Sequence, residues 1–433
     1  MSNPYLPKWE YIPDGEPRVF GNRIYVYGSH DRAGSSSFCD YILKVWSASL
    51  DDLSHWVCHG DAFCTRTSIN REKDVDWSDK ELYAPDVVEY KGKYYLYAYI
   101  VDSEGCIAVS DRPEGPFKLL SKYKFNKTAY PEQALISNGI FIDPGVLVDN
   151  DRIYLFCGYL KSFAVELEND MVTVKDETYI EDIIPDLPDE TGFFEACSPR
   201  KIGNKYYLIY SPKIGSRLAY AVSDKPLGPY HYGGILVDNG IDYPGGNNHG
   251  SICEINGQWY VFYHRMTNGT VYSRRGCVER ICFDKDGNIG QVEMTSLGFD
   301  KMLSPYEEVK AEIACVVKGR ARVKEENIFD RIVTDIKKGC IIGFKYLDFG
   351  NDMSSKTITL NLKVKNVSNR CSVRIVLDDY VGGEEIGTLK LAPGNGIFSD
   401  DVKSVSGVHS IFFIPEAENE ENLFDFICWM FSK

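Results

Sequence analysis

Short stretches of alternating aromatic and aliphatic residues, each preceded by a Gly, Asn or Asp turn, recur through the first two thirds of the chain. They are FGNRIYVYGS (20–29), YKGKYYLYAY (90–99), DNDRIYLFCG (149–158), IGNKYYLIYS (202–211) and INGQWYVFYH (255–264). Alternation with a period of two beside a tight turn is typical of a β-hairpin. The sequence therefore predicts the same hairpin five times.

The spacing of these hairpins predicts the architecture of this part of the chain. The tyrosines at equivalent positions are 70, 59, 53 and 53 residues apart, namely Tyr25, Tyr95, Tyr154, Tyr207 and Tyr260. Repeats of this length, with short strands and almost no helical periodicity, are typical of β-propellers, whose blades are four-stranded sheets around an axis. We therefore predict an all-β fold in which residues 1–304 form a five-bladed β-propeller.

The last third of the chain has a different texture. Alternating segments continue, but they are separated by loops rich in Gly, Asn and Asp: TITLNLKV (357–364), CSVRIVL (371–377), GTLKL (387–391) and VHSIFFI (408–414). This pattern is typical of an antiparallel β-sandwich. We predict that residues 305–433 form such a sandwich after the propeller.

Composition and charge narrow the classes of partner. The thirteen cysteines are an odd number without a CxxC pair, which favours buried reduced thiols over disulfides or a zinc site. The first residues lack a basic start followed by an apolar core, and no stretch is long and apolar enough to span a bilayer, so we expect a cytoplasmic protein. The net charge of −15 repels nucleic acid and anionic lipid, so we expect neither as a partner.

Ionisable residues occupy the strand before each hairpin turn. Counting back 11, 9, 11, 12 and 11 residues from the repeated tyrosines gives Asp14, Asp86, Asp143, Glu195 and His249. Each has an ordinary structural alternative when taken singly, since Pro-Asp-Gly is a turn signal and a lone His is often structural. Equivalent positions of successive blades converge on the propeller axis, however, so their coincidence favours one shared site.

Three converging carboxyl groups predict acid–base chemistry. Carboxylates in one pocket repel one another as they ionise, so at least one should hold a proton near neutrality. Glycoside hydrolysis requires such a pair, a protonated acid at the leaving oxygen and an ionised base that activates water. Glu195, with apolar neighbours, is the candidate acid and Asp14 the candidate base. Asp143 is expected to tune the pKa of Glu195 and to hold the sugar.

The motifs that carry these residues also resemble a known family. PDGEPRVF, YAPDVVEYKGKYYLY, IDPGVLVDNDRIYLF, FFEACSPRKIGNKYYLIYS and GGNNHGSICEINGQWYVFYHR occur in the order seen in glycoside hydrolase family 43, over about residues 5–300. The resemblance implies an inverting mechanism with base Asp14, modulator Asp143 and acid Glu195. It implies no cofactor for the chemistry, although the axial His of the family, which often coordinates calcium or water, falls on His249.

The resemblance also suggests residues that bind substrate. Tyr83-Ala84-Pro85 stands where many relatives have Trp-Ala-Pro, and Arg275, or the adjacent Arg274, corresponds to an arginine near the base and sugar. The expected substrate-binding residues are thus Tyr83, Asp86, Phe194 and Arg275.

Several functions remain open on sequence alone. The expected partners are hemicellulose-derived oligosaccharides, and we expect release of α-L-arabinofuranose from arabinoxylan fragments. A β-D-xylosidase is the alternative enzyme, and a non-catalytic sugar-binding propeller and a protein-interaction scaffold are the alternatives of other classes. In the last third, GFKYLDFG (343–350) and SGVHSIFF (406–413) resemble family 6 carbohydrate-binding modules. A sugar-binding role and a bracing role are both open for it.

Overall fold

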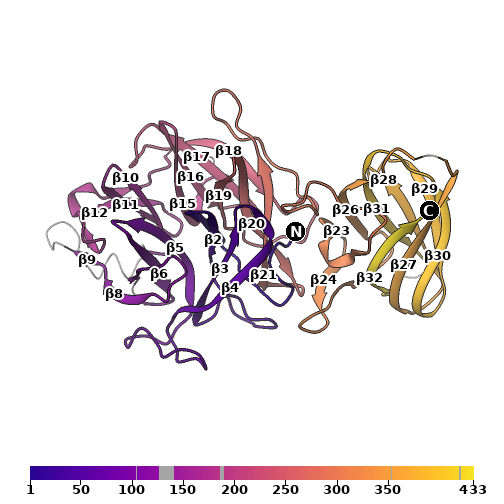
Figure 1. Ribbon diagram of the computed structural model, residues 1–433, viewed down its shortest axis with the longest axis horizontal. Helices are drawn as coiled ribbons and strands as arrows, with labels where there is room; N and C mark the ends of the chain where they lie inside the picture. Colours follow the sequence, from indigo (N-terminus) through magenta and orange to yellow (C-terminus); the bar gives the residue numbers. More distant parts are fainter. Residues whose placement is uncertain (104, 126–140, 186–189, 353, 419–420) are drawn as a thin grey trace.

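A computed structural model describes residues 1–103, 105–125, 141–185, 190–352, 354–418 and 421–433 of the chain. Figure 1 shows two lobes built of strands, with the C-terminus in the smaller lobe. The helices in these ranges are two short 3-10 turns, η1 (Asp176–Thr178) and η2 (Ala311–Ile313). The prediction of an all-β fold is confirmed.

The larger lobe contains five sheets among the residues described, which are antiparallel except for one short parallel pair in the third. The first sheet has the order β1 (Glu16–Phe20), β2 (Arg23–Tyr27), β3 (Ile42–Ser49) and β4 (Asp52–Cys64). The second is β5 (Leu82–Tyr90), β6 (Lys93–Ile100), β7 (Cys106–Ser110) and β8 (Lys118–Lys122). The third is β10 (Gly145–Asp149), β11 (Arg152–Cys157), β12 (Phe163–Leu167), β13 (Thr173–Val174) and β9 (Lys124–Phe125), with β14 (Ile180–Glu181) beside β12.

The fourth sheet is β15 (Phe193–Ile202), β16 (Lys205–Pro212), β17 (Arg217–Ser223) and β18 (His231–Asp238). The fifth has three strands, β19 (Ser251–Ile255), β20 (Gln258–Thr267) and β21 (Thr270–Ile281). Each of the five predicted hairpins joins the first and second strand of one sheet. Its two-residue turn contains residues with positive φ, such as Asn150 (φ 50°) and Asp151 (φ 60°), which suits the twist of a tight hairpin.

The first strands of the five sheets lie against one another in a cycle. Strand β1 contacts β5 and β19, and β10 contacts β5 and β15. Between β15 and β19, the hydroxyl groups of Ser198 and Ser251 are 2.6 Å apart and Arg200 donates to the carbonyl of Ile252. The approach of β10 to β15 requires glycine, because a Cβ on Gly145 would stand 2.2 Å from the carbonyl oxygen of Cys197.

Two further sheets form the smaller lobe. One contains β24 (Arg322–Glu325), β25 (Arg331–Thr334), β32 (Asp425–Ser432), β27 (Thr357–Val367) and β30 (Gly394–Lys403), with β22 (Val309–Lys310) beside β32. The other is β23 (Val316–Lys318), β26 (Ile341–Asp348), β31 (Val408–Glu416), β28 (Cys371–Leu377) and β29 (Glu385–Leu391). Aromatic rings pack between the sheets. The ring centroid of Phe344 in β26 lies 5.3 Å from that of Trp429 and 6.2 Å from that of Phe426, both in β32.

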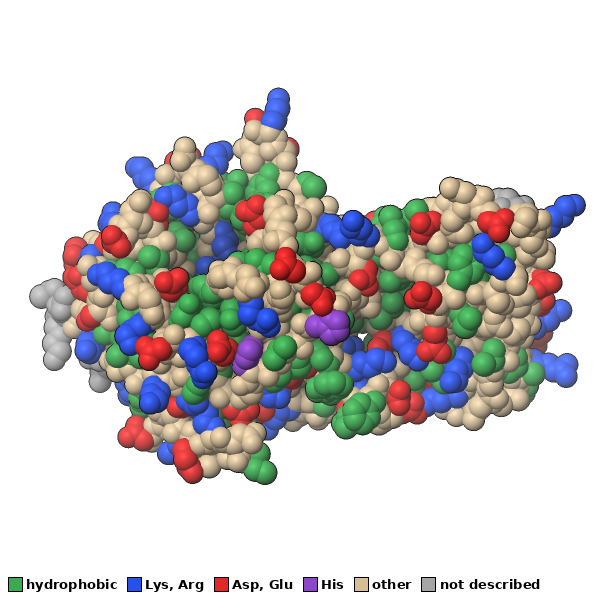
Figure 2. All heavy atoms as spheres, in the orientation of Figure 1, with side chains coloured by type: hydrophobic (Ala, Val, Ile, Leu, Met, Phe, Trp, Pro, Cys, Tyr) green, Lys and Arg blue, Asp and Glu red, His purple; other side chains and the backbone are tan. Residues whose placement is uncertain are grey.

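The cysteine side chains are free thiols, as their odd number without a CxxC pair favours. All thirteen cysteines are unpaired, and all but Cys58 and Cys282 are buried. Figure 2 shows acidic and basic side chains interspersed over the visible face of both lobes. Within the described ranges, no helix has the length and apolar character needed to cross a membrane.

Candidate active site

A cavity of about 480 Å³ lies where the first strands of the sheets begin. Its lining includes four of the five ionisable residues found by counting back from the repeated tyrosines: Asp14, Asp143, Glu195 and His249. The remaining lining includes five aromatic residues, which come from separate parts of the chain. The structure therefore brings together residues that are up to 235 positions apart in the chain, from Asp14 to His249.

Asp14 enters the cavity just before β1 in a strained backbone conformation. Its φ is +56°, in the left-handed region that non-glycine residues rarely adopt. Its backbone N–H donates to Nδ1 of His264 at 3.3 Å, while Nε2 of the same ring lies 3.0 Å from the carbonyl of Asn247. Nδ1 is thus the acceptor and Nε2 carries the hydrogen, so His264 is neutral and orients the backbone of Asp14.

The charge of Arg274 keeps Asp14 ionised. Burial alone would raise the pKa of its carboxyl, but the Arg274 guanidinium lowers it below its usual value. Arg274 donates from Nη1 to Oδ1 of Asp14 at 2.9 Å. Its remaining donors are held by Asp31, with Nε at 2.9 Å from Oδ2 and Nη2 at 2.8 Å from Oδ1. The site thus contains a fixed anion beside a fixed cation.

Glu195 and Asp143 are the carboxyl groups that resist ionisation. Burial and then the charge of Asp14 raise the pKa of Glu195 to about 7. Burial and then the charges of Glu195 and Asp14 raise the pKa of Asp143 well above its usual value. Coupling of this kind acts in both directions, so ionisation of either group opposes ionisation of the other. Near neutrality the cavity therefore contains an ionised Asp14 and carboxyl groups that hold protons.

Local irregularity in β15 aims Glu195 at the cavity. The pairing of β15 with β16 shifts register between Phe193 and Glu195 and again between Glu195 and Ser198. The next residue, Ala196, has a φ of +72°. Bulges of this type re-aim side chains beside functional sites. The side chain of Asn247 also hydrogen-bonds that of Glu195, which lowers its pKa against the two larger effects.

His249 lies between the two aspartates. Its Nδ1 is 3.9 Å from Oδ1 of Asp14 and 3.6 Å from Oδ2 of Asp143, and burial lowers its pKa. The described residues contain no group of three or more His, Cys, Asp or Glu side chains arranged to hold a metal ion. A calcium ion near His249 therefore stays a prediction, and we derive no step from a metal.

Aromatic side chains form the walls of the cavity. Tyr83 packs against Tyr99 with ring centroids 6.3 Å apart, and Phe194 packs against Tyr159 at 5.2 Å. Tyr83 and Phe194 were both expected to contact substrate, and both line the cavity. Rings of this kind pack well against the C–H faces of a sugar.

Two predicted substrate-binding residues do not line the cavity. Arg275 is buried away from it, and its Nη2 lies 3.5 Å from the carbonyl of Leu6, whereas Arg274 contacts Asp14. Successive side chains of a strand point to opposite faces, so only one of the two arginines of β21 can reach the site. Asp86 is buried beneath the site, where it accepts from Arg18 at 2.6 and 3.0 Å and from the backbone of Val146 at 2.7 Å.

Other residues of the site carry no clear sequence signal. They are Asp31, which holds Arg274, and the lining residues Phe38, Tyr99, Asp102, Tyr159 and Asn247. Most of them lie outside the first strand of each hairpin, where the repeated ionisable residues occur. For Asn247, the one sequence indication was that Asn247 and Asn248 directly precede His249.

This geometry defines a class of protein. A cavity with aromatic walls, one ionised carboxylate and nearby carboxyl groups with raised pKa values is the arrangement that hydrolysis of glycosidic bonds requires. The sequence model of glycosyl hydrolases family 43 matches residues 15–289. The chain belongs to this family of glycoside hydrolases.

Relatives of known name agree with the family. A Thermoclostridium stercorarium protein named xylosidase/arabinosidase is 37% identical, over 98% of this chain and 98% of the relative. A beta-xylosidase from Xylanibacter ruminicola is 30% identical over 68% of this chain and 100% of the relative. An arabinoxylan arabinofuranohydrolase from Paenibacillus polymyxa is 25% identical over 96% of this chain and 72% of the relative.

Solved structures with the same fold include members of this family. The Bacillus subtilis arabinoxylan arabinofuranohydrolase, 23% identical, aligns with a TM-score of 0.58 over 100% of this chain and 97% of that chain. A beta-xylosidase/alpha-arabinofuranosidase from a compost metagenome, solved in a calcium-free form with xylotriose, is 26% identical. It aligns with a TM-score of 0.54 over 67% of this chain and 97% of that chain.

Proposed function

We propose that the protein is an inverting exo-acting glycoside hydrolase that releases α-L-arabinofuranose from arabinoxylan-derived oligosaccharides. The observation that carries the proposal is the convergence of Asp14, Asp143 and Glu195 in one cavity with opposite protonation tendencies. The names of the relatives, which include arabinosidases and arabinofuranohydrolases, support this choice of substrate class.

Each carboxyl group has a distinct role in the proposed reaction. Glu195, with a pKa of about 7, donates its proton to the leaving glycosidic oxygen. Asp14, ionised beside Arg274, accepts a proton from the water that attacks the anomeric carbon from the opposite face. Asp143 titrates together with Glu195 and hydrogen-bonds the sugar. Inversion requires carboxyl groups of Asp14 and Glu195 about 6.5–9.5 Å apart, because water must fit between them.

A second candidate is a β-D-xylosidase acting on xylo-oligosaccharides. It is favoured by relatives named xylosidase/arabinosidase and beta-xylosidase, and the same acid and base serve both sugars. Release of p-nitrophenol from the α-L-arabinofuranoside and the β-D-xyloside, together with chromatography of sugars released from arabinoxylan and xylobiose fragments, separates the two. Failure to turn over any of these substrates would favour a non-catalytic sugar-binding protein.

Product stereochemistry tests the mechanism apart from the sugar. Proton NMR of the first anomer released should show inverted configuration before mutarotation. Asp14→Asn should abolish most of this activity while the protein still binds oligosaccharide. A product of retained configuration would contradict the roles given to Asp14 and Glu195.

We also infer that the five sheets are the blades of a five-bladed β-propeller over residues 1–304, and that residues 305–433 form a β-sandwich. The cycle of contacts among the first strands supports the first inference. The aromatic rings packed between the two C-terminal sheets support the second. Whether this sandwich binds sugar, as its resemblance to family 6 modules suggests, is tested by affinity electrophoresis of the full chain in arabinoxylan.

A cytoplasmic location is part of the proposal. Thirteen unpaired thiols, eleven of them buried, suit a reducing compartment. The substrates would then be short imported oligosaccharides. Fractionation of producing cells should place the activity with soluble cytoplasmic markers, and activity in the culture medium would contradict this.

A further inference from the structure

The chain segment that leads into Asp14 is held by the smaller lobe. Arg331 of β25 has a fully enclosed side chain, and its Nη2 donates to the carbonyl of Lys8 at 2.6 Å and to the hydroxyl of Tyr11 at 3.1 Å. The same nitrogen pairs with Oε2 of Glu325 at 3.0 Å. One buried guanidinium thus joins the hairpin β24–β25 to residues 8–11, just ahead of the candidate base.

Tyr11 is the point where three parts of the chain meet. Its hydroxyl donates to Oε2 of Glu325 and is 3.4 Å from Nδ2 of Asn268, in the turn between β20 and β21. Asn268 is itself tied to the smaller lobe, because its N–H donates to the carbonyl of Val323 at 2.8 Å and its Oδ1 accepts from the N–H of Glu325 at 2.6 Å. The hydroxyl therefore belongs to a partly buried network that joins three segments of the chain.

The backbone of Tyr11 continues this network into the site. Its carbonyl accepts from the N–H of Asp31 at 2.9 Å. Asp31 in turn holds Arg274 through both carboxylate oxygens, and Arg274 donates to Asp14 at 2.9 Å. Tyr11 thus reaches the candidate base by two routes, along three residues of chain and through Asp31 and Arg274.

We propose that Tyr11 and Arg331 are positioning residues, through which the smaller lobe fixes the orientation and ionised state of Asp14. This inference rests on the proposed function, since it gives Asp14 the role of base. A connected network of hydrogen bonds restrains its members far more than isolated surface contacts do. The smaller lobe thereby braces the active site from behind, a role that needs no sugar bound to the lobe itself.

The test uses the full chain and removes one hydroxyl group at a time. Tyr11→Phe removes the hydroxyl at the centre of the network and keeps the ring. Tyr306→Phe is the matched control, because its hydroxyl donates to the carbonyl of Phe349 at 3.1 Å within the smaller lobe. Arg331→Lys keeps the charge but loses the planar fork of donors.

We expect kcat to fall about threefold to tenfold in Tyr11→Phe, with KM within about twofold of the wild type. The acidic limb of the kcat/KM profile should move up by about half a pH unit or more, because Arg274 no longer holds Asp14 as closely. Tyr306→Phe should leave both unchanged. A purely structural role for Tyr11 would lower thermal stability without moving the acidic limb.

A readout that does not need turnover separates this inference from the proposed function. In protein carrying ¹³C-labelled aspartate carboxyl groups, with the signal assigned by Asp14→Asn, the titration midpoint of Asp14 should rise in Tyr11→Phe. An unchanged midpoint in folded Tyr11→Phe overturns the inference, whether or not Arg331→Lys folds. An inactive wild type would overturn the proposed function, while the titration would still decide the role of Tyr11.

Discussion

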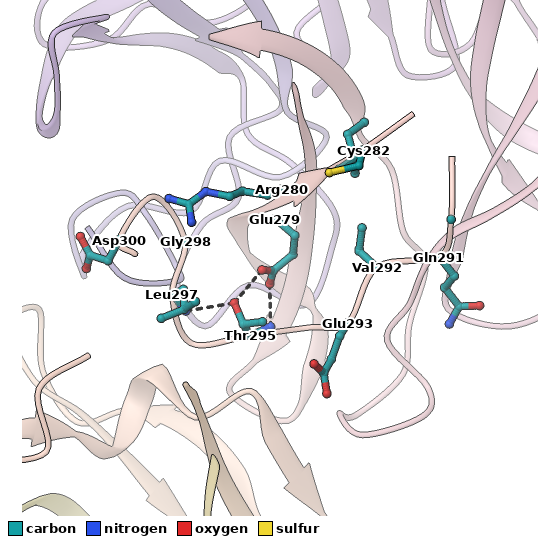
Figure 3. Close-up of a pocket in the computed structure, with 12 residues that line it drawn as sticks. Glu279, Arg280, Cys282, Gln291, Val292, Glu293, Thr295, Leu297, Gly298 and Asp300 are labelled. Carbon is teal, nitrogen blue, oxygen red and sulfur yellow. Dashed lines mark hydrogen bonds between the residues drawn. The ribbon is translucent and has the colours of Figure 1, made fainter. Parts of the chain in front are cut away.

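Two glutamates of the larger lobe, Glu195 and Glu279, have similarly raised pKa values but different surroundings. Burial is the main cause in both, and each carboxyl has a pKa of about 7. Glu195 lines the candidate active site, while Glu279 lines a second cavity of about 380 Å³ between β21 and residues 290–300 (Figure 3). A raised pKa beside a cavity therefore does not by itself distinguish a catalytic acid from a structural one.

The hydrogen-bond partners distinguish the two. Glu279 accepts from Nδ2 of Asn3, the hydroxyl of Tyr263 and Nη2 of Arg265 at 3.0, 3.0 and 3.2 Å. It also accepts from the N–H and hydroxyl of Thr295 at 2.8 and 2.7 Å, as Figure 3 shows. Its oxygens are thus occupied by hydrogen bonds that hold the edge of β21, whereas Glu195 shares an open cavity with an ionised carboxylate. A catalytic acid therefore needs a proton that substrate can reach and a second carboxyl group that is ionised.

The largest expected difference between the two glutamates is in catalysis. Glu195→Gln should lower kcat about 10²–10⁴-fold on oligosaccharides, whose leaving groups need a proton, and far less on p-nitrophenyl glycosides. Folded Glu279→Gln should keep kcat within about threefold of the wild type on both. Steady-state kinetics of the two variants on both substrates measure this. Equal losses on both substrates would remove Glu195 from the role of acid.

For stability, Glu279→Gln should have the harmful effect and Glu195→Gln should not. Glu279→Gln removes the charge that faces Arg265, which is 1% exposed, so we expect a loss of about 3–5 kcal/mol. For Glu195 the folded pKa lies above its usual value of 4.5, so its ionisation opposes folding, and stability falls as pH rises from about 4.5 to about 7. The neutral Glu195→Gln should therefore be more stable than the wild type at pH 8, by about 1–2 kcal/mol.

Urea unfolding of the wild type and both variants at pH 8 measures these changes. The gain for Glu195→Gln should shrink as the pH falls through 4.5, because below that pH the wild-type carboxyl is protonated in both states. If both substitutions destabilise the protein to the same extent at pH 8, the two glutamates have the same structural role and the comparison fails.

The pH dependence of activity should follow the titration of Glu195 and not that of Glu279. Because the acid must be protonated, kcat/KM on oligosaccharides should fall as pH rises through about 7, the pKa of Glu195. Glu279→Gln should retain this basic limb even though Glu279 has a similar pKa, and Glu195→Gln should lack it. The acidic limb should lie low, because Arg274 keeps the pKa of Asp14 below its usual value. Loss of the basic limb in Glu279→Gln would contradict these assignments.

The repeated hairpins show how much of the site could be predicted from sequence. In the structure the repeated tyrosines pair with residues 18, 88, 147, 200 and 253. Four positions before each partner lie Asp14, Ala84, Asp143, Ala196 and His249, of which all but His249 have positive φ. Turn chemistry and alternation were therefore sufficient to find three of the cavity residues, Asp14, Asp143 and His249, at a constant offset.

The two deviations from that offset have a structural cause. Glu195 precedes its equivalent position by one residue, and bulges in β15 turn it into the cavity. Asp86 follows its equivalent position by two residues, so it lies deeper, paired with Arg18. Bulges add or remove a residue locally, so a count along the chain cannot tell an aimed side chain from a displaced one. Arg274 and Arg275 are adjacent in the chain, so a count along the chain could not decide which of them reaches the site.

Glu279 and the network around Tyr11 were not predictable at all. Each depends on contacts between segments hundreds of residues apart, such as Asn3 with Glu279 and Tyr11 with Glu325. No repeat relates these segments, and their residue types are common on any protein surface. Only the packing of the chain shows that these polar groups lie together and hydrogen-bond one another.

The smallest expected effect comes from removing a single donor from each glutamate. Thr295→Val deletes the hydroxyl that donates to Glu279 at 2.7 Å, so it should lower the free energy of unfolding by about 1–2 kcal/mol and leave the pH profile unchanged. Asn247→Ala deletes the hydrogen bond that lowers the pKa of Glu195, so it should move the basic limb of kcat/KM upward by a few tenths of a unit and change stability little. Urea unfolding and pH–rate profiles of both variants measure the two effects side by side. If Asn247→Ala shifts only stability and Thr295→Val shifts the basic limb, then Glu279 rather than Glu195 controls the titration of activity.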